Sequence, residues 1–331
     1  MNKTVCLCNR IKRMKLINNQ ILIKPIQQEK VGSIFLPQNA GDTRKYTIVS
    51  GIVMNMPESP VYSYGNPNSL QVKLGFEIQP GDTVWFHFTC EQDAIEEGKF
   101  INDGFLVNYR DCYVAKRREH IIPLNGFVLG KPIVNDFLEQ FPALKAMGFR
   151  NSDKFVDAHD YRNRCIVTHL GQLIPEYKHG IDNEVIQPDD PSIKVGDDLI
   201  LTPYVGNEIE KLEHTLIPGQ PTYRFQRRDI VGKVVNNKIE SISSRLLIKA
   251  DAMPDKIGSI IIPERAKKPS DVQTGTVLSR GYFVKEKHSR VYFQKSRAMK
   301  ILFNGEEYFS VRERQLLGSD PSSPLFTELG S

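Results

Sequence analysis

The sequence predicts a mainly β protein made of small β-barrels in tandem, because a short apolar motif recurs near both ends in matching surroundings. Residues 32–37 read GSIFLP and residues 258–263 read GSIIIP. In each copy the glycine frees the backbone, and the proline fixes φ and removes a hydrogen-bond donor, so three apolar residues are bounded as a unit. One such triplet alone could equally be a short buried strand. Two copies, each followed by the same order of short strands, indicate an internal repeat.

The composition is that of a globular protein with no excess of basic residues outside its first 17 residues. The 331 residues suffice for two or three domains, with 40% hydrophobic and 25% charged residues. The net charge of +5 comes from an acid-free leader, residues 1–17, and elsewhere basic and acidic residues balance. We therefore expect no nucleic-acid partner. The leader's basic residues are Lys3, Arg10, Lys12, Arg13 and Lys15.

The leader and the cysteines bear on localisation. We expect residues 1–17 to be disordered, with an organelle-targeting peptide as the alternative. No apolar run is long enough for a secretory signal or a membrane span, so we expect no membrane association. An odd number of cysteines at irregular spacing favours reduced thiols and a cytoplasmic location. They are Cys6, Cys8, Cys90, Cys112 and Cys165.

The first predicted barrel spans residues 18–117. An apolar strand opens it, the GSIFLP motif follows, and a strand interrupted by Gly51 indicates a bulge or a close backbone approach. A loop rich in proline and serine leads to a Pro-Gly-Asp turn, a further strand and a closing segment. These elements are predicted at residues 20–25, 48–53, 57–69, 78–86 and 105–114.

The last predicted barrel, residues 236–318, repeats this order, and residues 319–331 form a flexible tail. Its opening, glycine-interrupted and closing strands are predicted at residues 245–250, 273–278 and 308–317. Ile301, Leu302 and Phe303 are placed where Val84, Trp85 and Phe86 stand in the first barrel.

A fainter third copy, residues 118–235, lies in the middle. Strands are predicted at residues 126–132, 165–171, 193–201 and 222–231, and Val195-Gly196-Asp197 matches the Pro-Gly-Asp turn. The apolar motif is missing. In its place, residues 135–161 carry apolar residues at nearly helical spacing, which predicts a short helical insertion.

This order of elements resembles the GroES-like co-chaperonins, the chaperonin-10 family. The family plan is a Val-Ile-Val-Lys-like strand, a loop with a Gly-Gly-Ile-Val-Leu-like core, a Gly-Glu-Val-Leu-like strand, a Val-Gly-Asp turn and a closing Glu-Ser-Asp-Ile-Leu-like segment. Ile21-Leu22-Ile23-Lys24 and Leu246-Leu247-Ile248-Lys249 fill the first place, and the later places follow in order. The resemblance covers most of residues 18–317 and implies tandem GroES-like barrels, two clear and one divergent in the middle.

The resemblance also implies a function. It implies a non-enzymatic co-chaperonin that forms a homo-oligomeric ring and caps a group I, GroEL-like chaperonin, assisting ATP-dependent folding of unfolded client proteins in the chamber. ATP would be bound and hydrolysed by the chaperonin, so no cofactor is expected here. Two mobile loops, residues 27–45 and 251–272, would bind the chaperonin through Gly32, Ser33, Ile34, Phe35, Leu36, Gly258, Ser259, Ile260, Ile261 and Ile262.

Alternatives of other classes stay open. A structural or interaction protein, such as a phage or virion component, could keep the barrels without the chaperonin contact. A nicotinamide-dependent dehydrogenase, which also contains such a barrel, is disfavoured because no Gly-x-Gly-x-x-Gly motif is present. Scattered histidines without ligand spacing predict no metal site.

Overall fold

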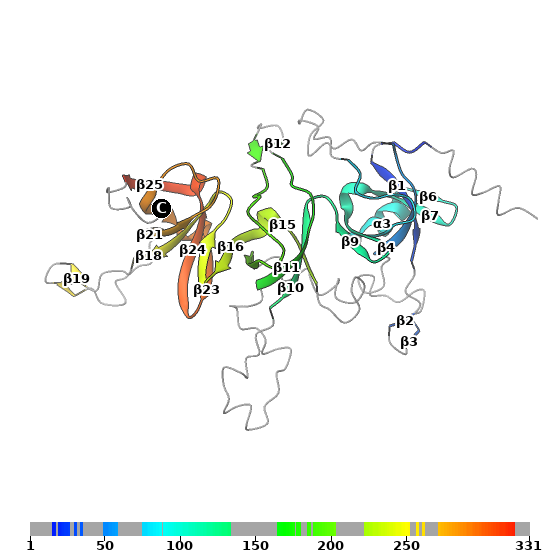
Figure 1. Cartoon of the computed structure of the whole chain (residues 1–331). Coiled ribbons are helices and arrows are strands. Elements are labelled where there is room, and N and C mark those ends of the chain that lie inside the picture. Colours follow the sequence, from blue (N-terminus) through cyan, green and yellow to red (C-terminus); the bar gives the residue numbers. More distant parts are fainter. Residues whose placement is uncertain are drawn as a thin grey trace, which may run out of the picture. The chain divides into compact units, whose positions relative to one another are not determined.

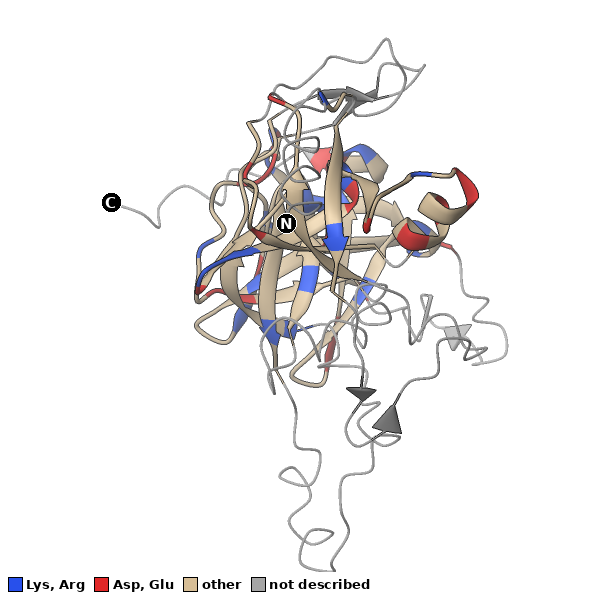
Figure 2. Cartoon of the chain, turned by 90° about the vertical axis from the view of Figure 1, so that its right-hand side faces the viewer, with Lys and Arg blue, Asp and Glu red and all other residues tan. Residues whose placement is uncertain are grey.

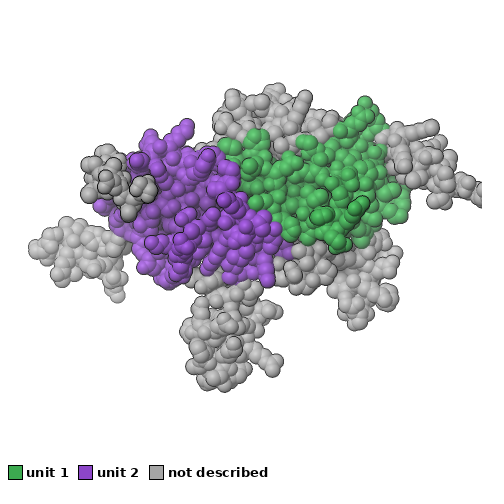
Figure 3. Space-filling model, in the orientation of Figure 1, with its two compact units in different colours: residues 1–129, 169–189, 224–227 green, residues 130–168, 190–223, 228–331 purple. Residues whose placement is uncertain are grey.

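The computed structural model shows a chain of antiparallel β-sheets (Figure 1). The chain divides into two compact units (Figure 3). The first contains residues 1–129, 169–189 and 224–227, and the second contains residues 130–168, 190–223 and 228–331. The structure describes residues 15–17, 19–26, 30–31, 34–35, 49–58, 75–87, 89–133, 164–175, 177–179, 184–186, 188–202, 222–251, 256–257, 260–261 and 271–321. The predictions for residues 1–14, the loop at 59–69, the helical insertion at 135–161 and the tail at 322–331 lie outside these residues.

Sheet 1 has seven strands in the order β6-β7-β1-β4-β5-β8-β9. Its core contains the apolar residues of β1 (Ile21 and Ile23), and the buried Cys90 and Ala94 of helix α3 (Thr89–Glu96) pack into it. Figure 2 shows that basic and acidic residues are interspersed over the described ribbon. The strands are β1 (Gln20–Pro25), β4 (Ser50–Asn55), β5 (Thr83–Phe86), β6 (Phe100–Ile101), β7 (Gly104–Asn108), β8 (Cys112–Arg117) and β9 (His120–Pro123).

Sheets 2 and 3 repeat this strand order. Sheet 2 runs β15-β10-β11-β14-β16-β17, and sheet 3 runs β23-β24-β18-β21-β22-β25. The strands of sheet 2 are β10 (Phe127–Pro132), β11 (Arg164–Leu170), β14 (Asp198–Leu201), β15 (Tyr223–Gln226), β16 (Ile230–Val235) and β17 (Lys238–Ser241). Those of sheet 3 are β18 (Arg245–Ala250), β21 (Val272–Arg280), β22 (His288–Gln294), β23 (Met299–Phe303), β24 (Glu306–Arg312) and β25 (Leu316–Pro321).

These orders confirm the predicted mainly β fold and its repetition. Five neighbouring strands correspond in each sheet. They are β7-β1-β4-β5-β8 in sheet 1, β15-β10-β11-β14-β16 in sheet 2 and β24-β18-β21-β22-β25 in sheet 3. Three two-stranded hairpins complete the described strands: β2 (Lys30–Val31) with β3 (Ile34–Phe35), β12 (Tyr177–His179) with β13 (Glu184–Ile186), and β19 (Lys256–Ile257) with β20 (Ile260–Ile261). None of the described helices has the length and apolar character needed to span a membrane.

One sequence-based equivalence was wrong. Strand β22, not residues 301–303, occupies the place of β5, because it lies between β21 and β25 as β5 lies between β4 and β8. Ile301, Leu302 and Phe303 belong to β23, which pairs with β24 at the sheet edge as β6 pairs with β7. The match lies inside β22, where Val291-Tyr292-Phe293 corresponds to Val84-Trp85-Phe86, but β22 begins with polar residues and has no Pro-Gly-Asp turn before it.

The turns predicted to be equivalent in sheets 1 and 2 share their hydrogen bonds. Gly81 and Gly196 have φ of 97° and 92°, a conformation that favours glycine. The N–H of Gly81 donates to the Val53 carbonyl at 2.8 Å, and that of Gly196 to the Val167 carbonyl at 2.9 Å. This agreement confirms that the middle copy follows the same plan as the first.

Candidate functional site

Both apolar motifs lie in connections between the same pair of neighbouring strands. The first connects β1 to β4 and the second connects β18 to β21. Each connection is closed at its base by one equivalent backbone hydrogen bond of 3.0 Å, from the N–H of Ile26 to the carbonyl of Ser50 and from the N–H of Asp251 to that of Thr274. The fold therefore presents the two motifs from equivalent positions of sheets 1 and 3.

Each motif forms part of a short antiparallel hairpin with the same register. Val31 lies opposite Ile34 in the first, and Ile257 opposite Ile260 in the second. The two residues between these partners are Gly-Ser in both hairpins. The residues that join the paired strands are therefore the same in both copies.

The hairpins extend the predicted site toward the N-terminus. The residues that pair with the motifs are Lys30, Val31, Lys256 and Ile257. They were not among the predicted site residues. The signal was available, since the repeat reads Lys-Val-Gly-Ser-Ile in one copy and Lys-Ile-Gly-Ser-Ile in the other. A β-branched residue, a Gly-Ser pair and a further β-branched residue form a hairpin pattern.

Of the ten predicted site residues, the structure places four in these paired strands: Ile34, Phe35, Ile260 and Ile261. The other six, Gly32, Ser33, Leu36, Gly258, Ser259 and Ile262, lie outside the described residues. The role of all ten in binding a chaperonin stays a prediction.

Hydrogen bonds fix the base of the second motif's connection on both sides. The Asp251 carbonyl accepts a bond of 2.7 Å from Gln273 Nε2, and its carboxylate pairs with Arg290 at 2.7 Å. On the other side, the Asp271 carboxylate accepts bonds from the backbone N–H and hydroxyl of Ser296, at 2.9 and 2.8 Å. These bonds hold the pKa of Asp271 below its ordinary value. The connection that contains the hairpin thus begins and ends at anchored residues.

The middle sheet carries no equivalent of these hairpins among its described residues. The corresponding connection joins β10 to β11 and contains residues 135–161, where the helical insertion is predicted. The sequence carries the Gly-Ser-Ile motif twice, in the connections of sheets 1 and 3.

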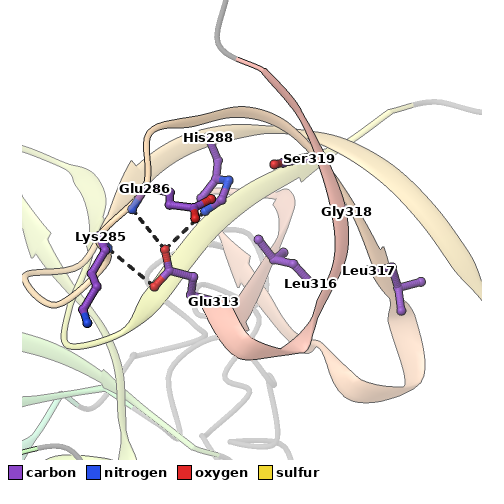
Figure 4. Close-up of a pocket in the computed structure, with 8 residues that line it drawn as sticks. All are labelled: Lys285, Glu286, His288, Glu313, Leu316, Leu317, Gly318 and Ser319. Carbon is purple, nitrogen blue, oxygen red and sulfur yellow. Dashed lines mark hydrogen bonds and ion pairs between the residues drawn. The ribbon is translucent and has the colours of Figure 1, made fainter.

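Sheet 3 also contains a hollow of about 340 Å³ beside β25 (Figure 4). On one side, Glu313 accepts hydrogen bonds from the backbone N–H groups of Lys285 and Glu286, at 3.5 and 3.2 Å, and its carboxylate lies 3.3 Å from His288 Nε2. The opposite side is formed by Leu316, Leu317, Gly318 and Ser319. The Glu313 carboxylate thus binds three neighbouring groups, which is typical of a structural network and not of a reaction centre.

The titratable groups of the described residues give no sign of a metal centre. No group of three or more His, Cys, Asp and Glu side chains in this part of the chain could hold a metal ion. The thiols of Cys90, Cys112 and Cys165 are buried and unpaired by disulfides, and burial raises the pKa of Cys90 to about 12. These thiols are poorly suited to nucleophilic chemistry.

One known protein family is similar to the C-terminal copy. A comparison with curated proteins gives no match. A family described as Chaperonin 10 Kd subunit matches residues 238–319, a range that begins with β17 and contains the β19–β20 hairpin and most of β25. The C-terminal sheet, with its hairpin bearing Ile260 and Ile261, is therefore similar to the chaperonin-10 family.

Proposed function

We propose that this chain is a co-chaperonin that binds a group I chaperonin through the β2–β3 and β19–β20 hairpins and assists the folding of client proteins in the capped chamber. The single observation that supports it best is the hairpin shared by both motifs, in the same register and between equivalent strands. One of the two hairpins lies inside the region that is similar to the chaperonin-10 family.

The mechanism follows from burial of apolar area. Each motif offers three consecutive apolar residues, and docking them into an apolar groove gains about 25 cal/mol per Å² of buried area. Ordering the connection on docking costs conformational entropy, so one hairpin alone binds weakly and reversibly. Two hairpins in one chain raise the effective concentration of the second after the first has bound. ATP binding and hydrolysis belong to the chaperonin.

The two motifs differ in shape. Phe35 in the first is aromatic, whereas the second is a run of β-branched isoleucines with restricted χ1. We expect the two hairpins to contribute unequally to binding by one chaperonin.

The test is nucleotide-dependent capture of the purified chain by a GroEL-like chaperonin, with ATP or ADP. One variant carries Ile34→Ser and Phe35→Ser, a second carries Ile260→Ser and Ile261→Ser, and a third carries all four. We expect weakened capture in each double variant and none in the fourfold variant, with loss of chaperonin-assisted refolding of a client. Leu173→Ser is the matched control, because Leu173 is an exposed leucine outside both connections.

The proposal fails if the fourfold variant is captured as well as the unmodified chain, or if no chaperonin captures the unmodified chain with either nucleotide. The second result would favour the structural role, in which fused barrels serve an assembly without contacting a chaperonin.

A further inference from the structure

We propose that sheet 3 binds single-stranded nucleic acid across its outer face, along β22 and the connection before it. The phosphates contact lysine and arginine side chains, and the bases stack on two exposed tyrosine rings. This inference does not depend on chaperonin binding. It revises the expectation of no nucleic-acid partner, because that expectation rests on the charge balance of the chain as a whole.

The charge is not divided evenly among the three copies. Residues 18–235 hold 23 basic and 28 acidic residues, whereas residues 236–318 hold 16 basic and 9 acidic ones. The last copy is therefore the basic part of the chain after the leader. A nucleic acid responds to such a local concentration of positive charge, even where the remaining chain is acidic.

The basic residues are most concentrated in residues 280–297. This segment contains six basic residues and one acidic residue, Glu286. It runs from the end of β21 through the connection at residues 281–287 and through β22 to a 3₁₀ turn, Lys295–Arg297. The six basic residues are Arg280, Lys285, Lys287, Arg290, Lys295 and Arg297.

Three carboxylates adjoin this segment, and they neutralise little of it. Asp251 pairs with Arg290 at 2.7 Å, Asp271 accepts two hydrogen bonds from Ser296, and Asp320 lies opposite Arg290 in the register. In the described part of the chain, the other five cations form no ion pair. They are Arg280, Lys285, Lys287, Lys295 and Arg297, of which all but the half-buried Lys295 are exposed.

The alternation of β22 places an aromatic ring beside Arg290. Val291 and Phe293 are fully buried in the core of sheet 3, so Arg290 and Tyr292 face outward. Tyr292 is 38% exposed and lies opposite Thr274 on one side and Gly318 on the other. Neither neighbour has a side chain large enough to cover the ring, so a base can stack on it.

A second ring lies in the connection before β22. Tyr282 is 68% exposed and meets Phe283 edge to face, with 5.0 Å between the ring centroids. The connection itself is held by backbone hydrogen bonds from Gly281 to the Arg245 carbonyl and from Phe283 to the Ser243 carbonyl, both at 2.8 Å. The ring of Tyr282 is therefore presented to solvent from a fixed backbone, between Arg280 and Lys285 in the sequence.

The pairing of β22 determines how a ligand can bind. Both edges of β22 are occupied, by β21 and β25, so a ligand cannot join the sheet there as a further strand and must lie across its face. The seven residues of β22 extend over about 23 Å, which suits a strand of about four nucleotides.

A single nucleic-acid strand fits this face better than an acidic peptide or a duplex. A peptide would use the cations alone, whereas a nucleic acid uses the cations for its phosphates and the two tyrosine rings for its bases. Stacking on a side chain needs bases that are not already stacked in a duplex, so the occupant is single-stranded.

The test is the affinity of the purified full chain for labelled oligo(dT) and, separately, oligo(U) of about 12 nucleotides, measured by fluorescence anisotropy at several salt concentrations. We expect binding that weakens as salt rises, because the phosphates release counterions on binding. Lys285→Gln combined with Lys287→Gln should weaken binding and reduce the salt slope by about 0.7 for each phosphate contact that is lost.

The tyrosine variants separate stacking from charge. Tyr282→Ala and Tyr292→Ala should each lower the affinity at least about fivefold with an unchanged salt slope. Tyr282→Phe and Tyr292→Phe keep the rings and should bind like the unmodified chain. Both tyrosines are exposed, so circular dichroism should show unchanged folding.

The control is Lys131→Gln combined with Lys194→Gln, which removes the same charge from exposed lysines outside sheet 3 and should leave the affinity nearly unchanged. No binding by the unmodified chain, or an equal loss in the control, would overturn the proposal. So would full binding by both alanine variants, since the basic leader or the cations alone would then account for it. Displacement by polyglutamate as effective, at equal charge, as displacement by unlabelled oligonucleotide would also contradict a role for the rings.

Discussion

Gly51 and Gly275 lie where neighbouring strands approach too closely for a side chain. A Cβ at Gly51 would stand 2.8 Å from the Lys24 carbonyl oxygen, and one at Gly275 would stand 2.7 Å from that of Lys249. Backbone oxygen atoms in a sheet cannot move aside. We expect Gly275→Ala to destabilise the protein by about 1 to 3 kcal/mol, measured by chemical denaturation. Gly75→Ala is the control, since nothing lies within 4 Å of its added Cβ, and equal losses would contradict this account.

Asp82 connects the Pro-Gly-Asp turn to the end of β8. Its carboxylate is 2% exposed and accepts bonds from Arg117 Nε and Nη2 at 2.9 and 2.8 Å, and from the Gln79 N–H at 2.9 Å. We expect Asp82→Ala to cost about 2 to 3 kcal/mol in unfolding free energy, somewhat below a fully buried pair because Arg117 is 35% exposed. Asp103→Ala, at an exposed ion pair with Lys24, should cost less than about 1 kcal/mol.

Glu77 provides a pH-dependent contribution to stability. Burial raises the pKa of its carboxyl above the ordinary 4.5, although the Asn125 N–H and the Tyr109 hydroxyl donate to it. Because the folded pKa is raised, the stabilisation is complete below pH 4.5 and is lost as pH rises through the raised pKa. We therefore expect Glu77→Gln to raise the thermal midpoint more at pH 7 than at pH 4.

The control for Glu77 is Glu119→Gln, since the Glu119 side chain is 92% exposed. If Glu77→Gln changed the thermal midpoint equally at pH 4 and pH 7, burial would not favour the uncharged form of Glu77.

At the level of elements, most strands were predicted from regular patterns in the sequence. The glycine-interrupted strands were correct in both outer copies, because Gly51 and Gly275 are required by close contacts that recur with the fold. The turn at Gly196 was also found, because a positive φ restricts the residue type. Local constraints of this kind are visible in the sequence.

The missed elements depend on tertiary contacts. Helix α3 has only two buried residues, Cys90 and Ala94, so its apolar periodicity is weak. Strand β22 was missed because no Pro-Gly-Asp turn precedes it, although its Val291-Tyr292-Phe293 matches Val84-Trp85-Phe86 of β5. For the candidate site, the motif was found. Its partner residues Lys30 and Lys256 stand in the repeated sequence before the motif, but their pairing with it was recognised only in the structure.

One element-scale prediction concerns β15 and β8. The Arg224 guanidinium stacks over Tyr113, an arrangement worth about 0.5 to 2 kcal/mol. We expect Arg224→Ala to lower the free energy of unfolding by that amount, while Arg224→Lys should retain part of it. A double-mutant cycle with Tyr113→Leu measures the coupling, and a coupling near zero would show that the stacking contributes nothing.

At the scale of the whole molecule, buried thiols report on each compact unit separately. Cys90 and Cys112 lie in the core of sheet 1, in the first unit, and Cys165 is buried in β11, in the second. We expect these three thiols to resist a disulfide reagent in the native protein and to react as denaturant is added. Mass spectrometry of partly labelled chains identifies which unit opens first, and rapid native labelling of any of the three would contradict the burial.

The three sheets follow one another along the chain without interleaving. Every strand of sheet 1 precedes residue 124, every strand of sheet 2 lies between residues 127 and 241, and sheet 3 begins at residue 245. During synthesis, each sheet can therefore complete its hydrogen bonds before the next has left the ribosome. Since β1 and β18 are alike in sequence and place, this order of emergence keeps a strand of one copy from entering the sheet of another.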